Sequence, residues 1–304
     1  MADSNPYVDF VVSNHPLYDR YYKDWRLQEV SYYGATEYKH ARLLRAYTVD
    51  MQTPAETIST YVTDDSGAVV AKRRASVENN PTHSPSAAAA GNDVLDGSFY
   101  GEKLDNTPLY NYVKLIVAEY NAMLWRNPPQ RLLGDAPEMD TFINDVDGEG
   151  NSVNEFMNLV DTWSTIYGVV HVGCYKPLGS DIPKWKLHKP TDVTNWEYTY
   201  DRNGSLTLSK VAIKIEDSDV HEIYRVMTAD TIDTVFMGKD EDYTAPIDDP
   251  ELVQIDDSVF MISQPNELGY VPLKTFYQSV KVYNNVGTTV IQDVAGIQRS
   301  IYSY

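Results

Sequence analysis

A short acidic stretch carries the side chains best suited to bind a cation. Its oxygen-bearing residues fall at alternate positions: Asp145, Asp147, Glu149 and Asn151. Calcium loops place their ligands at this spacing and a glycine at the position of Gly150. The closing bidentate carboxylate of such a loop would fall at residue 156, which is Phe156. The sequence therefore favours an acidic approach to a helix capped by Ser152, and a calcium loop is the weaker interpretation.

The same carboxylates could supply the acid and base of a hydrolase, with Asp145, Asp147 and Glu149 as candidates. The signatures of other enzymes are missing from the sequence, including a phosphate-binding loop, a Gly-x-Ser-x-Gly elbow and a complete dinucleotide fingerprint. His221-Glu222 is followed by Arg225 where a zinc protease needs its second histidine. We therefore assign no catalytic residue and no metal site, and we expect neither enzyme activity nor a cofactor.

Two tryptophans suggest a different kind of site. Trp185 and Trp196 could stack on sugars if they were exposed, as in a carbohydrate-binding module, or they could belong to the core or edge of a sheet. The sequence favours the core or edge interpretation. The chain has 24 tyrosines against 7 phenylalanines, and tyrosine suits partly hydrated contacts between subunits better than the hydrophobic core.

The charge balance limits the partners. The 304 residues include 25 Lys and Arg against 44 Asp and Glu, which gives a net charge of −19. Tight, sequence-independent binding to duplex DNA or to anionic lipid requires clustered basic residues, so any contact with DNA should be weak or repulsive. The composition, with 42% hydrophobic and 23% charged residues, is that of a globular protein.

Cysteine usage and hydropathy indicate the compartment. Cys174 is the one cysteine, which excludes an intrachain disulfide and a multi-thiolate zinc site, and its apolar neighbours are typical of a small core residue. The first ten residues lack the basic and apolar regions of a signal peptide. No window approaches the roughly 18 to 20 apolar residues that a membrane span requires. We expect synthesis in a reducing cytoplasm and no membrane insertion.

Helical periodicity recurs in four stretches that would position these residues. The first runs from about His15 to Tyr33, where Gly34 ends it. The second begins at Thr107-Pro108 and stops at Asn127-Pro-Pro129. The third begins at the capping box formed by Ser152 and Glu155. The fourth begins near Val290, and its apolar positions include Ile291, Val294, Ile297 and Ile301.

Strand patterns lie between and after these helices. A hairpin is predicted from strands at 58–62 and 68–70, single strands at 169–175 and 269–276, and an antiparallel meander at 195–200, 206–215, 220–227, 231–237 and 259–263. The glycine- and proline-rich stretch 76–107 is predicted to be a loop or linker. The segment 240–257 contains eight acidic residues and no Lys or Arg, which is typical of a solvated loop. Together the patterns predict an α+β fold.

The order of several short motifs along the chain resembles that of one protein family. The series is His15-Pro-Leu-Tyr18 with Trp25 and Gly34, Asn127-Pro-Pro129, Asp145-Val-Asp-Gly-Glu-Gly150, Gly168-Val-Val-His-Val-Gly-Cys-Tyr-Lys-Pro177, Asn195-Trp-Glu-Tyr198, Tyr224-Arg-Val226, Gly269-Tyr-Val-Pro-Leu273 and Asp293-Val-Ala295. It resembles the N-terminal half of tailed-bacteriophage portal proteins, the head-to-tail connectors, particularly those of podovirus-like phages. Each motif is short, and the order carries the resemblance over most of the chain.

The resemblance implies a structural role in the virion, with assembly in the cytoplasm of the bacterial host. Portal proteins form a ring, typically of twelve subunits, through which double-stranded DNA passes without tight binding during packaging and ejection. Their partners are the major capsid protein, the large terminase subunit and head–tail adaptor or tail proteins. The family is usually longer, with stem, clip and crown parts, so two interpretations stay open: a fragment of a longer protein, or a smaller protein that shares only the wing.

The implied organisation has four segments. Residues 1–75 form an N-terminal helix and hairpin region, 76–107 a linker, 108–289 a helical and β-rich wing region, and 290–304 the start of a helix leading toward a stem. The candidate subunit-contact residues are Tyr18, Tyr22 and Trp25 on the first helix and Tyr112, Ile116 and Tyr120 on the second; burial in the core of their own chain is the alternative. Other functions left open are another virion structural protein, such as a head–tail adaptor or a tail or carbohydrate-binding module, and the acidic-residue hydrolase.

Overall fold

The chain is divided into two compact units. The computed structural model describes residues 5–34, 58–63, 69–75, 110–130, 137–176, 182–240, 243, 251–256 and 258–302. Unit 1 comprises Met1–Arg26 and Glu119–Val290, and unit 2 comprises Leu27–Ala118 and Ile291–Tyr304. Two helices contribute residues to both units: α2 (Pro16–Tyr33) and α7 (Tyr112–Leu124). Each unit therefore draws on stretches that are distant in the sequence.

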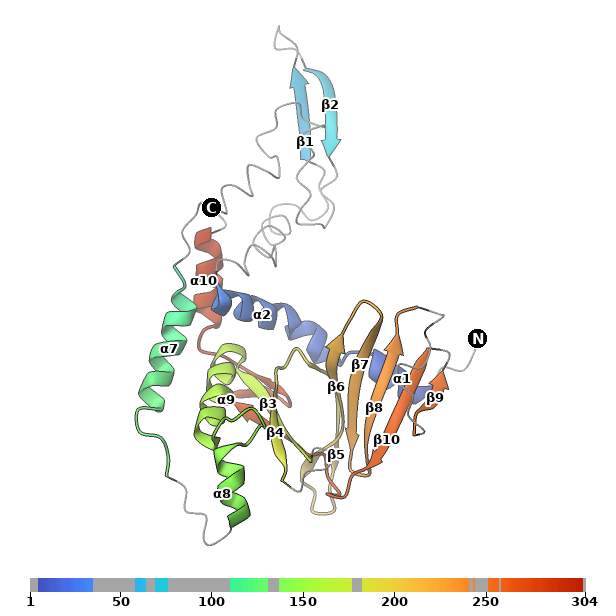
Figure 1. The fold of residues 1–304 in the computed structure, drawn as a ribbon. Helices are drawn as coiled ribbons and strands as arrows, with labels where there is room; N and C mark the ends of the chain where they lie inside the picture. The colour runs from blue at the N-terminus through green and yellow to red at the C-terminus, as the bar shows by residue number, and fades with distance from the viewer. Residues whose placement is uncertain are drawn as a thin grey trace. The chain divides into compact units, whose positions relative to one another are not determined.

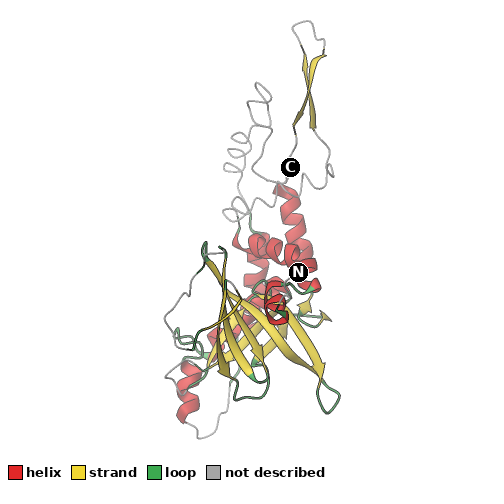
Figure 2. Ribbon diagram, turned by 90° about the vertical axis from the view of Figure 1, so that its right-hand side faces the viewer, coloured by secondary structure: helices red, strands yellow, loops and turns green. Residues whose placement is uncertain are grey.

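The largest element of unit 1 is a six-stranded antiparallel sheet (Figures 1 and 2). Its order is β5-β6-β7-β8-β10-β9, formed by Val193–Tyr200, Leu206–Asp217, His221–Thr228, Thr231–Gly238, Val259–Pro265 and Val253–Asp256. Its first five strands are the predicted meander, which is confirmed. Helices and antiparallel sheets together confirm the α+β class.

A short helix near the N-terminus covers one face of this sheet. Helix α1 (Pro6–Val12) begins after Asn5, whose side chain accepts a hydrogen bond from the backbone N–H of Tyr7. Its Phe10 and Val11 join a core cluster that the sheet completes with Ala212, Tyr224, Val226, Val235 and Val259. The hydroxyl of Tyr7 donates to Asp233 at 2.8 Å and so joins α1 to β8. Sequence patterning missed this helix because it has only two turns.

A second, three-stranded sheet of unit 1 packs under helix α9. Its order is β11-β3-β4, formed by Leu273–Tyr277, Val169–Tyr175 and Lys184–His188. Helix α9 (Val153–Tyr167) begins with the predicted capping box, because the Ser152 side chain accepts from the N–H of Glu155 and the Glu155 carboxylate accepts from the N–H of Ser152. Figure 1 shows α9 lying along β3.

Gly168 connects α9 to β3 and has a left-handed backbone, with φ of +80°. A Cβ atom at this position would meet the backbone of Thr288 at 2.6 Å. The turn therefore requires glycine both for its conformation and for the close approach of the hairpin formed by β12 (Lys281–Tyr283) and β13 (Val286–Gly287).

The remaining elements are a hairpin and two helices. Strands β1 (Ile58–Thr63) and β2 (Val69–Ala75) pair antiparallel in unit 2, which confirms the predicted hairpin. Helix α8 (Pro137–Asn144) belongs to unit 1, and helix α10 (Gln292–Tyr302) to unit 2. The predicted linker at 76–107 and most of the acidic segment 240–257 lie outside the described residues, as does the predicted helix start at Thr107-Pro108. In the described ranges, no helix is long and apolar enough to cross a membrane.

Candidate functional site

Asp145, in the acidic loop before α9, is paired with a lysine of the same chain. Asp145 Oδ1 accepts backbone hydrogen bonds from Gly148 at 2.8 Å and from Gly150 at 3.0 Å. The ammonium of Lys184, on β4, lies 2.7 Å from Asp145 Oδ2 and 2.6 Å from the Asp145 carbonyl oxygen. The Lys184 ammonium and the loop N–H groups hold the pKa of the Asp145 carboxyl below its usual value.

Asp147 and Asn151 are also bonded within this loop, whereas Glu149 is exposed. Asp147 accepts from the N–H of Glu149 at 2.9 Å and from the side-chain amide of Asn151 at 2.7 Å. Phe156, which stands where a calcium loop has its closing carboxylate, is buried against Trp185 with ring centroids 5.7 Å apart. In the parts of the chain that the structure describes, no three His, Cys, Asp or Glu side chains are grouped so as to hold a metal ion. The loop geometry is that of a turn whose cation is a lysine.

Two buried histidines lie opposite each other in the three-stranded sheet. His171 on β3 pairs with His188 on β4 in the strand register. Burial lowers the pKa of each to about 3, so both are neutral at pH 7, and Lys186 and Arg225 reinforce the effect at His188. His188 Nε2 lies 2.7 Å from the hydroxyl of Tyr175. Because the positive form is so unfavourable, this pair is unsuited to exchange protons near neutral pH.

These histidines belong to a polar network within unit 1. His171 Nδ1 lies 3.1 Å from the hydroxyl of Thr275, and that hydroxyl donates to Asn285 Oδ1 at 3.0 Å. Tyr198 on β5 donates to the same amide oxygen at 2.8 Å. The guanidinium of Arg225 on β7 lies 4.9 Å from the centre of the Tyr175 ring on β3. The network joins the two sheets, and its geometry is that of a structural connection.

The isolated candidates for chemistry are engaged in the fold. Cys174 is half-buried, and burial raises the pKa of its thiol, which therefore stays protonated at neutral pH. Trp196 is buried and stacks on His15, with ring centroids 4.1 Å apart. Trp185 packs between Phe156 and Phe142, whose ring centroid lies 5.2 Å away. Both tryptophans thus contact aromatic rings of their own chain.

The six residues predicted for subunit contacts divide by exposure. Tyr18 and Trp25 are buried, and the Tyr18 hydroxyl donates to the Thr191 carbonyl at 2.9 Å. Tyr22 is 40% exposed, Tyr112 46% and Ile116 40%, and Tyr120 is intermediate. The exposed members on α7 are joined by Leu115, at 58%, which sequence reasoning did not single out.

The helices of unit 2 meet through polar side chains. Gln298 on α10 accepts a hydrogen bond from the N–H of Val113 in the first turn of α7 and donates to the carbonyl of Ser31 in the last turn of α2, each at 3.1 Å. Asn111 accepts from the N–H of Lys114 at 2.8 Å and donates to the Tyr32 carbonyl at 2.8 Å. These backbone groups have no partner within their own helices, so the side chains cap two helix ends at once.

Burial in unit 2 is mixed: apolar residues such as Val113, Val117 and Ile291 are buried, but polar side chains are buried beside them and large apolar ones are exposed. Polar side chains lie inside: Gln28, Glu29, Ser31 and Gln298 are each at most 6% exposed. Large apolar side chains lie outside: Tyr33, Tyr110, Tyr112, Leu115, Ile116, Ile297 and Ile301 are each at least 40% exposed. Apolar side chains on a helix normally face the core, and contiguous exposed ones mark surfaces that bind other molecules. This outer surface is the strongest candidate functional site in the described residues.

Comparison of the sequence with models of known protein families, and with curated proteins, finds no match.

The double cap formed by Gln298 can be tested by removing its polar atoms. In Gln298→Leu the N–H of Val113 and the carbonyl of Ser31 each lose the hydrogen bond to Gln298 in a buried setting, which should cost roughly 2–5 kcal/mol. Hydrogen exchange should accelerate at the Val113 amide, and the urea midpoint of unit 2 should fall. Gln292→Leu, at an exposed position of the same helix, is the control and should change stability by less than about 0.5 kcal/mol. Unchanged exchange at Val113 would contradict the assignment.

The internal cation of the acidic loop can be tested through the carboxyl that it contacts. In Lys184→Met, NMR titration should show the pKa of Asp145 rising toward its ordinary value, because the first cause of its depression is gone. Lys186→Met, at an exposed position two residues along β4, should leave that titration unchanged. If calcium shifts the loop resonances of the unmodified protein at micromolar concentration, the loop is a metal site after all.

The buried histidines should make the fold sensitive to mild acid. Below pH 6.5 the histidines of the unfolded chain become protonated, whereas His171 and His188 in the folded chain stay neutral down to about pH 3. The free energy of unfolding should therefore fall as the pH falls from 6.5 toward 3. Each histidine contributes up to about 1.4 kcal/mol per pH unit. Urea midpoints at pH 7.5, 6.5 and 5.5 measure the loss, and His188→Gln should reduce its slope. Equal slopes in the two proteins would refute the explanation.

Proposed function

We propose that the chain is a structural subunit of the portal ring of a tailed bacteriophage, placed at one capsid vertex of the virion. It would line a channel for packaging and ejecting the genome and catalyse no reaction itself. Its partners in this proposal are further copies of the chain, twelve in a typical ring of the family that the sequence resembles, with the major capsid protein, the large terminase subunit and head–tail adaptor or tail proteins. Residues 1–289 would form the wing-type region, and α10 would begin the helix that follows it.

The observation that carries this proposal is the set of large apolar side chains that unit 2 leaves exposed. Exposed apolar side chains stand on the outer sides of both α7 and α10, including Leu115, Ile116 and Ile297. A chain that displays apolar residues on two different helices can bind a copy of itself through two different patches. Such a heterologous contact forms a ring when the rotation from copy to copy closes after a whole number of copies, and an open filament when it does not.

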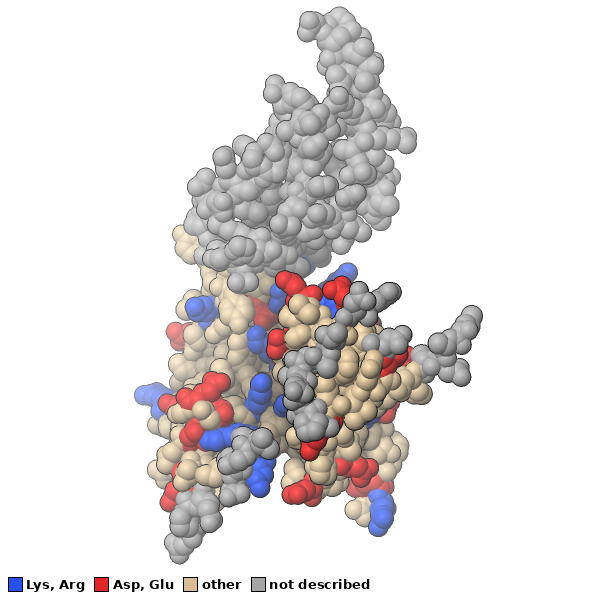
Figure 3. Space-filling view, turned by 45° about the vertical axis from the view of Figure 1, so that its right-hand side comes forward, with Lys and Arg blue, Asp and Glu red and all other residues tan. Residues whose placement is uncertain are grey.

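The charge of the chain also supports a channel for DNA. The net charge of −19 repels phosphates, and salt screens this repulsion only beyond about 10 Å at moderate ionic strength. On the face drawn in Figure 3, basic side chains of the described residues stand in small groups beside acidic ones, and they form no continuous basic area. A channel wall formed by this face would let DNA slide past, because the face offers no row of phosphate-binding groups.

Particle size and shape test the proposal. Sedimentation velocity of the purified full chain should give a species many times its mass of 34.4 kDa, and electron microscopy should show annular particles with a central opening. Ile116→Asp should shift the distribution toward smaller species, because it places a charge in the apolar outer surface. Tyr200→Asp, at a position that is 73% exposed in unit 1, is the control and should assemble normally.

Three results would count against the proposal. A 34.4 kDa species that persists at the highest soluble concentration would exclude a self-assembling ring. Turnover of a substrate that is lost in Asp147→Asn would favour a hydrolase. Glycan binding by solitary particles, lost when Trp185 is replaced, would favour a carbohydrate-binding virion protein.

A further inference from the structure

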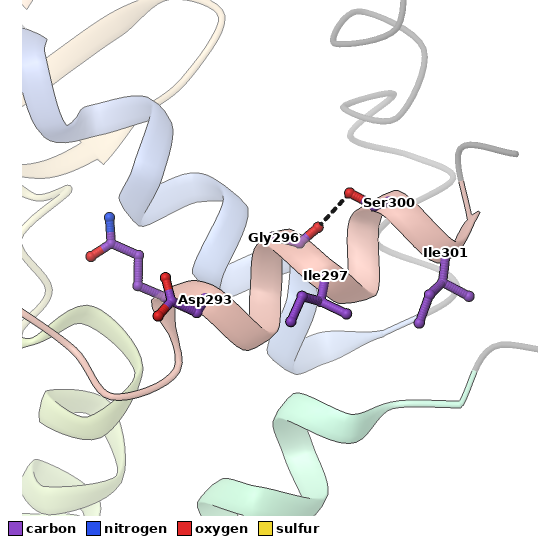
Figure 4. A pocket seen from close by; sticks show the side chains of 6 residues that line it. Asp293, Gly296, Ile297, Ser300 and Ile301 are labelled. Atoms are coloured by element: carbon purple, nitrogen blue, oxygen red, sulfur yellow. Dashed lines mark hydrogen bonds between the residues drawn. The ribbon is translucent and has the colours of Figure 1, made fainter.

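The outer side of α10 forms a shallow groove (Figure 4). It is lined by Gln292, Asp293, Gly296, Ile297, Ser300 and Ile301. A Cβ atom added to Gly296 would meet nothing within 4 Å, so there is open space above the middle of the helix. The hydroxyl of Ser300 donates to the Gly296 carbonyl at 3.0 Å, as the dashed line in Figure 4 shows. The middle of the groove can therefore be covered without leaving that hydroxyl unpaired.

The outer side of α7 in unit 2 has the opposite shape. Tyr112, Leu115 and Ile116 project large side chains into solvent, with 40–58% of their surface exposed. Lys114, next to Leu115, is the one charged residue in the unit 2 part of this helix. Helices pack closely when large side chains on one enter a groove between side chains on the other. The α7 face supplies the large side chains, and the α10 face supplies the groove.

We propose that the α7 face of one copy of the chain packs into the α10 groove of the next copy. The inference rests on the proposed function and names the contact that joins neighbouring subunits. It places Leu115 and Ile116 over Gly296 and Ser300, flanked by Ile297 and Ile301. Because the two faces differ, every copy offers one of each, as a closed ring requires.

Charge separates this pairing from the two symmetric ones. Asp293 lies in the α10 groove and Lys114 beside the α7 face, and the structure gives neither of them an ion-pair partner among the described residues. Two α10 grooves facing each other would bring two aspartates and no lysine, and two α7 faces would bring two lysines and no aspartate. Only the mixed pairing brings the two opposite charges to one contact, which favours it over either symmetric alternative.

Cysteine cross-linking of the full chain tests the contact, in a Cys174→Ala background. The double variant Leu115→Cys with Ile297→Cys should, on mild oxidation, give a ladder of covalent multimers on a non-reducing gel. Either substitution alone should give no covalent dimer. Dimers from Ile297→Cys alone would indicate that α10 of one copy contacts α10 of the next. Dimers from Leu115→Cys alone would indicate a contact between two α7 helices. Either result would overturn the inference. Urea midpoints confirm that each variant folds.

A charge exchange gives a second readout that does not depend on cysteine. Lys114→Asp and Asp293→Lys should each raise the chain concentration at half-assembly, by about threefold or more, and the double variant should return it toward the original value. Single variants without effect, or a double variant no better than the singles, would overturn the contact.

The outcome for the proposed function is read separately. A chain that sediments as a large ring yet gives no ladder retains its proposed function and loses this contact. A chain that stays at 34.4 kDa under all conditions loses both.

Discussion

The double cap of Gln298 determines which sides of the unit 2 helices face inward. One side chain binds an N–H at the start of α7 and a carbonyl at the end of α2, and Asn111 makes a second bridge between the same two helix ends. Backbone groups of two helix ends meet here, and burying such groups requires polar partners from outside the helix. Amides therefore share the interior with apolar residues such as Val113, Val117 and Ile291. Leu115, Ile116 and Ile297 consequently lie on the outside, and the proposed contact between copies depends on that placement.

Local sequence signals predicted much of the fold. The capping box of Ser152 and Glu155 and the alternating strands of the meander each depend on neighbours within a few residues, and the structure has both. Strand β4 was not predicted, although Trp185 and Leu187 alternate with Lys184 and Lys186, because the alternation spans only five residues. Its partner across the sheet fixes it instead.

The residues of the exposed apolar surface could be predicted only in part from the sequence. Periodicity identified Tyr112 and Ile116, because aromatic and apolar residues recur on that helix, but periodicity does not say which side of a stripe is covered. On α10 the apolar positions split, with Ile291 buried and Ile297 and Ile301 exposed, because Ala295 and Gln298 occupy the inner side. The reason lies in hydrogen bonds that span 185 and 267 residues of sequence. No local pattern encodes them. The Lys184 contact with Asp145, 39 residues away, is a smaller case of the same kind.

The packing around Gln298 also bears on the geometry of any assembly. In a ring closed through α7 and α10, the angle between the outward directions of these two helices within one subunit sets how far each copy is rotated from the last. That angle is held inside the subunit by the amide between the helices, and the crossing angle at the contact between subunits adds to it. Buried polar residues away from the contact would then help to set the number of copies around such a ring.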